Sequence, residues 1–472
     1  MGKQRGIPKT EPSTTETSRR RLLQAGLAAG AAAGLGGWRT ATASASPRPR
    51  GGRLREPGSL PYPHLPAGTD TIPQIEHIVV LMMENHSYDN RLGMLRRRDA
   101  DGFRLGRRGR PLAANPYANG DIQHAFRMPT TCQLSAQPSQ AWLDSHTQFA
   151  GGDNDGFVIS GSGPVAMGYW QEADQPFYYS LASVFPIADR YFCSVLGKTY
   201  PNRRYLISAT SIGMVNDTQP ALTDYPANGT IFDRLDAGGV SWRDYYSTLP
   251  TTELYPELYF KNAGTKVVPI ADFFSDAAAG TLPGFCLVEP DYDIQSEENP
   301  QNIVAGEQFA ARVVSAVMAG PAWAKTLLIW TYDEHGGYHD HVSPPAAVPP
   351  DDVEGRSLIG SPTKLQAFLR PFLPGLVESK ENLDRGPHWY DRYGFRVPAV
   401  IVSPYARPDY VCSTVLDHTS VLKLVEEKWN LPALTARDAE AAAPWDALDL
   451  ASPPAFLHPP DLPEPALKWG TW

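Results

Sequence analysis

The chain has few cysteines and no long apolar stretch that would span a membrane. Four cysteines occur in 472 residues, with no C-x-x-C spacing that would indicate a metal or redox site: Cys132, Cys193, Cys286 and Cys412. They allow three complete disulfide pairings, and buried thiols are an equal alternative. After the N-terminal region, no stretch approaches the roughly 18 uninterrupted apolar residues of a transmembrane helix. We therefore expect no membrane-spanning segment in the mature chain.

The chain also lacks an excess of basic residues. Its 42 Lys and Arg face 51 Asp and Glu, for a formal net charge of -9, and much of the positive charge lies near the N-terminus. Binding to a nucleic-acid backbone requires a basic surface, so we expect no nucleic-acid partner. The hydrophobic content of 42% is sufficient for a large core.

In the first 45 residues, a basic motif, a weakly apolar run and small residues follow one another in the order typical of an export signal. The motif S-R-R-R-L-L at residues 18–23 resembles the twin-arginine (Tat) motif, and a soft Ala/Gly run follows it. Small residues then offer cleavage after Ala43 or Ala45. A disordered basic tail is the alternative. We predict a Tat signal peptide that engages the Tat export machinery and places the mature protein in the cell envelope or outside the cell.

The rest of the chain divides by composition. Residues 46–71 are rich in Pro, Gly and Arg, which predicts a linker or loosely held arm. We expect the catalytic domain at residues 72–440 and a Pro-rich C-terminal extension at residues 441–472. Residues 341–390 are dense in Pro and charge, which predicts a surface insertion that forms a lid or substrate rim.

Four apolar runs of strand length predict an α/β fold. They occupy residues 78–83, 285–288, 327–330 and 397–402, with helical patterns at 306–318 and 419–429. This alternation predicts a mostly parallel central sheet covered by helices. Each run ends in polar residues: E-N, E-P-D, D-E-H and S-P-Y. Because ligand sites form at the carboxyl ends of parallel strands, we expect these clusters to converge.

Two of these clusters offer oxygen ligands. Glu84 and Asn85 follow the first run, although a helix cap and a turn are the alternative roles. Asp333 and Glu334 follow the third run, and adjacent carboxylates repel unless a cation or proton separates them. The glycines at 336 and 337 allow a tight turn there. A solvated polar loop is the alternative, and the nearby histidines do not match the H-E-x-x-H spacing of zinc helices.

A third motif places a hydroxyl at the start of a helix. In L-G-K-T-Y-P-N-R-R-Y, residues 196–205, Pro201 favours the first turn of a helix, so Thr199 is predicted at or just before its N-terminus. Free N–H groups and the helix dipole stabilise an alkoxide or bound phosphate at that point. A helix cap is the ordinary role of a threonine in this position.

These motifs, in this order, resemble a known family. The resemblance extends from about residue 75 to 437 and rests on six segments: I-E-H-I-V-V-L-M-M-E-N-H-S-Y-D-N from residue 75, D-R-Y-F-C-S-V-L-G-K-T-Y-P-N-R from 189, T-I-F-D-R-L from 230, Y-D-E-H-G-G-Y-H-D-H-V from 332, S-P-Y-A-R from 403 and D-H-T-S-V-L from 417. They are similar to the bacterial phosphoesterase family of Tat-exported phospholipases C and acid phosphatases. The resemblance implies an alkaline-phosphatase-like fold, with a mostly parallel sheet, helices on both faces and loop insertions.

The resemblance also implies a metal site and a nucleophile. It assigns Glu84, Asn85, Asp333 and Glu334 to one divalent metal ion, with the Thr199 hydroxyl as a further ligand and as the nucleophile that forms a phosphothreonine intermediate. An all-oxygen set suits Ca²⁺ best, while Zn²⁺, Fe and Mn stay open.

The general acid is less clear from the resemblance. His341 and His418 are candidates, with Asp417 available to orient the second ring, and His146 also has a family counterpart. His86, His335 and His339 are expected around the ligands. The chain departs from the family at Gln140 and Glu298, where relatives often have histidine.

Three functions follow from this pattern. The first is a phosphodiesterase acting on a phospholipid or similar phosphate ester, with transient contact to a membrane surface. Threonine at the nucleophile position favours this phospholipase branch by resemblance. The alternatives are an acid phosphatase that cleaves monoesters and a pseudoenzyme that binds phosphate-bearing ligands without cleaving them.

Overall fold

The structure is a computed structural model. It describes residues 54–133, 137–218, 220–353, 357–358, 369, 378–379 and 390–465. The predicted signal peptide with its cleavage points, and most of the predicted insertion at 341–390, lie outside the described residues.

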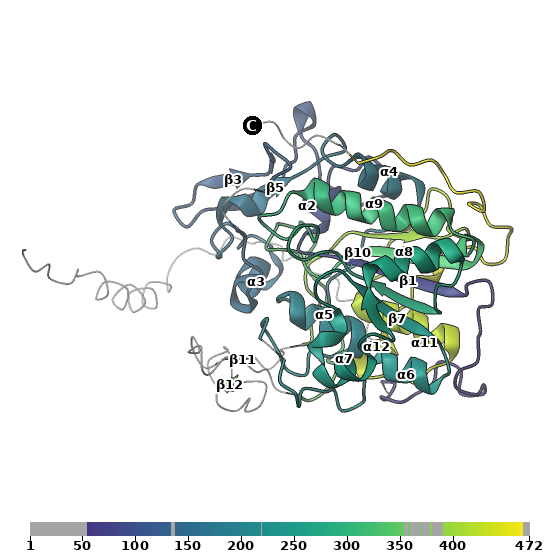
Figure 1. Cartoon of the computed structure of the whole chain (residues 1–472). Coiled ribbons are helices and arrows are strands. Elements are labelled where there is room, and N and C mark those ends of the chain that lie inside the picture. Colours follow the sequence, from purple (N-terminus) through teal and green to yellow (C-terminus); the bar gives the residue numbers. More distant parts are fainter. Residues whose placement is uncertain are drawn as a thin grey trace, which may run out of the picture. The chain divides into compact units, whose positions relative to one another are not determined.

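The central element is an eight-stranded sheet among the described residues (Figure 1). In spatial order, its strands are β14 (Val411–Cys412), β6 (Ile187–Ala188), β13 (Ala399–Val402), β10 (Thr326–Tyr332), β1 (His77–Met83), β9 (Phe285–Val288), β7 (Trp242–Tyr246) and β8 (Val267–Pro269). Smaller two-stranded sheets pair β2 (Ala114–Pro116) with β3 (Ile122–His124), β4 (Phe126–Arg127) with β5 (Gly168–Tyr169), and β11 (Ser357–Leu358) with β12 (Glu378–Ser379).

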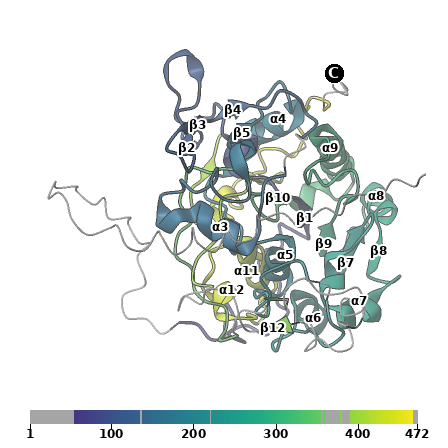
Figure 2. The same cartoon turned by 90° about the vertical axis from the view of Figure 1, so that its left-hand side faces the viewer.

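Helices cover both faces of the central sheet. The helices are α2 (Tyr88–Leu92), α3 (Trp142–Phe149), α4 (Pro176–Val184), α5 (Thr199–Ser208), α6 (Ile231–Ala237), α7 (Pro256–Asn262), α8 (Ile270–Ala279), α9 (Ile303–Ala319), α11 (His418–Trp429) and α12 (Ala436–Glu440). Helices α8 and α9 lie on one side of the sheet, and α5, α6 and α11 lie on the other (Figures 1 and 2). The predicted α/β fold is therefore confirmed.

The register of β1 and β10 brings two sequence motifs together. The strands are parallel, and their pairs run from His77 with Thr326 to Met83 with Tyr332. Glu84 and Asp333 therefore leave the sheet side by side. Both strands are almost entirely buried because helices cover the two faces, which is why each reads as an unbroken apolar run.

The strand predicted at 397–402 is present as β13, but it runs in the direction opposite to the one expected. Strand β13 is antiparallel to β10 and to β6, whereas β1 is parallel to β9 and β10. Ser403 follows the carboxyl end of β13, which therefore lies at the opposite end of the strands from Glu84 and Asp333. It does not join the other polar clusters. An apolar run indicates that a strand is buried but not in which direction it runs. The sequence therefore could not distinguish a parallel from an antiparallel strand.

The described part of the predicted arm is held in place. The side-chain N–H of Asn430 donates to the carbonyls of Tyr62 (3.1 Å) and Leu65 (2.9 Å), and its Oδ1 atom accepts from the Tyr62 N–H (2.9 Å). Asn430 ends α11 with a left-handed φ of 45°, which aims its side chain at this segment. The expectation of a loosely held arm is thus wrong for these residues.

Two expectations about cysteine and membrane segments can be compared with the structure. All four cysteines are free, and Cys193, Cys286 and Cys412 are buried, as the thiol alternative predicts. Within the described ranges, none of the helices has the length and apolar character needed to cross a bilayer.

Candidate active site

The loops after β1 and β10 pack closely on one another. Gly336 has a φ of 64°, and a Cβ atom built on it would lie 1.9 Å from the carbonyl oxygen of Asn85. Gly337 also has a positive φ, of 75°. The two glycines therefore allow the tight turn that the sequence predicts, because a side chain at 336 would push the loops apart.

Asn85 lies at the centre of a group of oxygen atoms. Its backbone N–H donates to Asp333 Oδ1 (3.1 Å). Its side-chain Oδ1 atom accepts from the Thr199 hydroxyl at 3.2 Å, and this terminal position lies 2.6 Å from Glu334 Oε1. Without a cation, the amide satisfies these oxygens by turning its NH₂ group toward them. With a cation, its oxygen can join them as a ligand.

Thr199 is the first residue of α5, as predicted, and its side chain is buried. The turn before it is fixed by Asn202, whose Oδ1 atom accepts from the Val195 N–H (3.0 Å) and whose Nδ2 atom donates to the Gly197 carbonyl (3.1 Å). The hydroxyl therefore lies at the preorganised N-terminus of α5, the positive end of the helix dipole, where the Tyr200 N–H donates to Asp217 Oδ1 (2.8 Å).

The carboxylates of this site are deficient in positive charge. Burial raises the pKa of Glu84 and Glu334 well above the usual range, and the charge of Asp333 raises both further. Within the described residues, the Oε2 atom of Glu84 has no hydrogen-bond partner. Buried acids in this state take up protons or bind a cation, so the residues present are suited to a divalent metal.

Arg203 belongs to the site although the sequence reasoning did not select it. Its Nε atom donates to Asp333 Oδ2 (3.0 Å), and its Nη1 atom lies 3.3 Å from Glu289 Oε2. It lies one turn after Thr199 on α5, so the two side chains share a helix face. The spacing of four within the K-T-Y-P-N-R motif was the signal that could have identified it. We treat it as a residue that positions Asp333.

A second group of possible metal ligands comes from the same two sequence motifs that contain Asn85 and Asp333. Ligand atoms of Asp89, Asp340 and His341 all lie within 4.8 Å of one another. The carboxylate oxygens of Glu84, Asp333 and Glu334 are not all within that distance of one another. Arg396, however, donates to Asp340 Oδ1 (2.9 Å) and to Asp89 Oδ1 (3.2 Å). Each of the two acidic groups therefore has an arginine partner, Arg396 in this group and Arg203 at Asp333.

His341 takes part in this second group and does not line the pocket of Thr199. Its Nδ1 atom lies 2.8 Å from Asp89 Oδ2, and its Nε2 atom lies 3.1 Å from Asp101 Oδ1. Burial alone would lower the pKa of His341, but the charge of Asp89 and both hydrogen bonds raise it to about 10. The ring is therefore a charged partner in an ion-pair cluster.

His418 and His146 are also absent from the lining of this pocket, as far as the described residues show. The His418 Nε2 atom lies 2.6 Å from the Asp333 carbonyl oxygen, and burial lowers the pKa of the ring to about 4. The ring of His146 lies 4.6 Å from that of Trp142, and burial lowers its pKa. The geometry gives no support to a general-acid role for these two residues, which stays a prediction.

The expected pairing of Asp417 with His418 is wrong. The Asp417 carboxylate accepts from the Ser194 hydroxyl (2.8 Å) and the Thr419 hydroxyl (2.5 Å), at the N-terminus of α11. The two neighbouring side chains point in different directions because the first caps the helix and the second contacts the loop after β10.

The other motif histidines lie near the predicted ligands. The Nδ1 atom of His335 lies 3.2 Å from Glu334 Oε2, and burial lowers the pKa of its ring to about 3. His86 lies 2.8 Å from Asn90 Oδ1, and His339 lies 3.8 Å from Asp89 Oδ2. His335 is thus the neutral ring that contacts the predicted ligand set.

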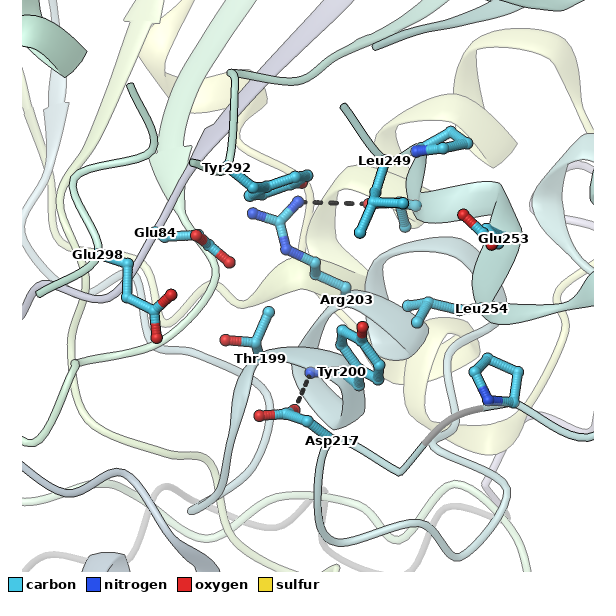
Figure 3. A pocket seen from close by; sticks show the side chains of 13 residues that line it. Glu84, Thr199, Tyr200, Arg203, Asp217, Leu249, Glu253, Leu254, Tyr292 and Glu298 are labelled. Atoms are coloured by element: carbon cyan, nitrogen blue, oxygen red, sulfur yellow. Dashed lines mark hydrogen bonds between the residues drawn. The ribbon is translucent and has the colours of Figure 1, made fainter. Parts of the chain in front are cut away.

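A cavity of about 320 Å³ opens beside Thr199 (Figure 3). Its lining includes Glu84, Tyr200, Arg203 and Glu298. Of the two positions where relatives often have histidine, Glu298 lines the cavity and Gln140 does not. Burial raises the pKa of Glu298.

A buried hydroxyl at a helix N-terminus, with carboxylates at the ends of parallel strands, is the arrangement of a hydrolytic α/β enzyme. The chain belongs to the Phosphoesterase family, whose model matches residues 75–432. Members of this family are hydrolases of phosphate ester bonds, and so is this protein.

Curated relatives agree with this assignment. Phospholipase C A of Mycobacterium tuberculosis is 30% identical over 447 residues, which cover 83% of this chain and 80% of that protein. Phospholipase C B of the same organism is 31% identical, with 84% and 81% covered. Non-specific phospholipase C6 of Arabidopsis thaliana is 30% identical, with 83% and 75% covered.

Solved structures show a more distant likeness. A protein in the alkaline phosphatase superfamily from Vibrio parahaemolyticus is 10% identical with a TM-score of 0.36, and the match covers 83% of this chain and 72% of that one. Human ectonucleotide pyrophosphatase / phosphodiesterase 5 is 11% identical with a TM-score of 0.34, covering 58% and 94%.

Proposed function

We propose that the protein is a metal-dependent phosphodiesterase of the phospholipase C type, with Thr199 as its nucleophile. One observation supports this above the others: the Thr199 hydroxyl lies beside Asn85 at the start of α5 and lines a cavity of about 320 Å³. The names of the curated relatives support the substrate class.

The residues that would hold the divalent cation are Glu84, Asn85, Asp333 and Glu334, together with the Thr199 hydroxyl. A bound cation would lower the pKa of that hydroxyl and offset negative charge on the phosphoryl oxygens. The metal is best matched by Ca²⁺, because every ligand is an oxygen.

The chain's own residues account for the remaining steps. Thr199 Oγ1 attacks the phosphorus and gives its proton to solvent water, the bond from phosphorus to the leaving alcohol breaks, and that alcohol takes up a proton from solvent water. The positive end of the α5 dipole, at Thr199, favours the negative charge of the transferred phosphoryl group. Water then hydrolyses the phosphothreonine ester, which releases a phosphate monoester and restores the hydroxyl. Arg203 keeps Asp333 in place throughout.

A substrate panel tests this function. Phosphatidylcholine, bis-p-nitrophenyl phosphate and p-nitrophenyl phosphate are assayed side by side with the wild-type protein and with Thr199→Ala. We expect turnover of both diesters and its loss in Thr199→Ala. Turnover of the monoester alone would instead identify an acid phosphatase. Absence of turnover of all three, with phosphate esters still bound, would indicate the pseudoenzyme.

We also propose that the protein is exported by the twin-arginine route to the cell envelope or the exterior. The motif at residues 18–23 supports this. Replacement of Arg19 and Arg20 by lysine should leave the full-length chain in the cytoplasm. Unchanged export of that variant would contradict the proposal, and N-terminal sequencing of the exported wild type should show cleavage after Ala43 or Ala45.

A further inference from the structure

The cavity beside Thr199 has two chemically different sides. Glu84 and Glu298 lie on one side of Thr199, and Leu249 and Leu254 lie on the other (Figure 3). The cavity lining also includes two prolines, and we call Pro220, Leu249, Pro250 and Leu254 the apolar wall. Glu253 also lies near the two leucines, so a substrate meets carboxylates on one side of Thr199 and leucines flanked by a carboxylate on the other.

The apolar wall extends from the interior to the surface. Leu254 is 5% exposed, whereas Leu249 is 48% exposed although it lines the cavity. Leu222, two residues after Pro220 in the chain, is 44% exposed. Isolated exposed leucines are common, but Leu249 belongs to the wall of the cavity that Thr199 lines.

The segment that presents Leu249 is anchored to the catalytic residues. The Thr251 N–H donates to Glu289 Oε1 (2.6 Å), and the Thr252 N–H donates to Asp244 Oδ2 (3.1 Å). Arg203 Nη1 lies 3.3 Å from the Thr251 hydroxyl. Because Arg203 also contacts Asp333, the position of the apolar wall is fixed relative to Thr199.

Charge around the cavity indicates which lipid surface is suited to this wall. Asp217, Glu253 and Glu298 line the cavity, and the charge of Arg203 is already matched by Asp333 and Glu289. An anionic lipid surface would be repelled by these acids, whereas a zwitterionic surface would not.

We infer that the apolar wall receives the glyceride part of a zwitterionic phospholipid, with Leu249 entering the apolar layer of the lipid surface while the phosphodiester reaches Thr199. This inference rests on the proposed function and adds the orientation of the substrate in the same cavity. Leu249 would then contact the apolar layer of the lipid surface, and burial of its side chain there is energetically favourable.

Hydrolysis of two substrates tests the inference. The rate on phosphatidylcholine vesicles is divided by the rate on bis-p-nitrophenyl phosphate, which has no acyl chains. Leu249→Asp should lower this ratio about tenfold, the effect expected when a leucine side chain can no longer be buried. Leu249→Ala should lower it less. The matched control is Leu457→Asp, at a 47% exposed leucine outside the cavity lining, which should leave the ratio unchanged.

Vesicle binding provides a second readout that does not depend on turnover. In the Thr199→Ala background, Leu249→Asp should lower the fraction that sediments with phosphatidylcholine vesicles, and added phosphatidylglycerol should lower it as well. An unchanged ratio and unchanged sedimentation for Leu249→Asp would overturn the inference, as would stronger binding to the anionic vesicles. If the wild type hydrolyses no diester, the proposed function fails, and sedimentation alone then decides whether the apolar wall binds lipid.

Discussion

The Thr199 hydroxyl lies 3.2 Å from the Asn85 Oδ1 atom, although 114 positions separate the two residues in the chain. Asn85 adopts a left-handed φ of 69° at this point, a conformation that asparagine tolerates better than most residues. The strained turn after β1 thus directs an amide at the first residue of α5, and the account of catalysis depends on this contact.

Replacement of Asp333 tests which acidic group holds the metal. Asp333→Asn should lower kcat by roughly 10³-fold and reduce the bound metal from about one ion per chain to near zero, because it removes a charged ligand. Elemental analysis of purified protein measures this directly. His341→Gln, in the group with Asp89 and Asp340, is the control and should retain the metal. The opposite pattern would move the site to that group.

Removal of Arg203 should destabilise the fold as well as slow the reaction. Arg203→Ala leaves two buried carboxylates, Asp333 and Glu289, without their cation, which typically costs about 3–5 kcal/mol in free energy of unfolding. Urea denaturation measures this change. Arg243→Ala breaks the half-exposed pair with Asp276 and should cost less than about 1 kcal/mol. Similar losses in both variants would refute the positioning role.

The raised pKa of His341 predicts a pH-dependent contribution to stability. The folded-state pKa is about 10, above the ordinary value of 6.5, so the charged ring stabilises the fold fully below about pH 6.5. This contribution declines as the pH rises toward 10. His341→Gln should therefore lose about 2 kcal/mol of unfolding free energy at pH 6 and much less at pH 9.5. A loss that is equal at both pH values would contradict the ion-pair assignment.

Gly336 should tolerate no side chain. In Gly336→Ala, the Cβ atom would meet the Asn85 carbonyl at 1.9 Å, which forces the ligand loops apart. We expect an unfolding free energy lower by about 3 kcal/mol and a kcat lower by about 100-fold. Gly109→Ala is the matched control because it has a similar φ of 69° and open space around it, and it should cost about 1 kcal/mol. Equal effects would show that backbone conformation alone matters.

The sequence was sufficient to identify the strands that are buried on both faces. Strands β1 and β10 are apolar on both faces, and α5 begins where Pro201 predicts, so the two acidic pairs proposed as ligands and Thr199 could be placed before the fold was known. The direction of β13 could not be predicted because burial is the same in either direction. The strands β6 and β14 have two residues each, too few for a periodic pattern.

Partners that depend on the tertiary fold were beyond the sequence. The spacing from Thr199 places Arg203 on the same helix face, but its partners Asp333 and Glu289 lie 130 and 86 positions away and follow only from the fold. His341 and His418 have the residue type of a general acid, but their contacts with Asp89 and with the Asp333 carbonyl follow from how the loops pack.

A covalent phosphothreonine is the most direct test of the account. The protein is mixed with bis-p-nitrophenyl phosphate, quenched in acid within milliseconds and digested, and the peptide that contains Thr199 is analysed by mass spectrometry. We predict a transient adduct on Thr199, a p-nitrophenyl phosphate ester formed as one p-nitrophenol leaves, that is absent from Thr199→Ala. Substrate turnover with no adduct on any residue, or with the adduct on a different side chain, would contradict the central claim.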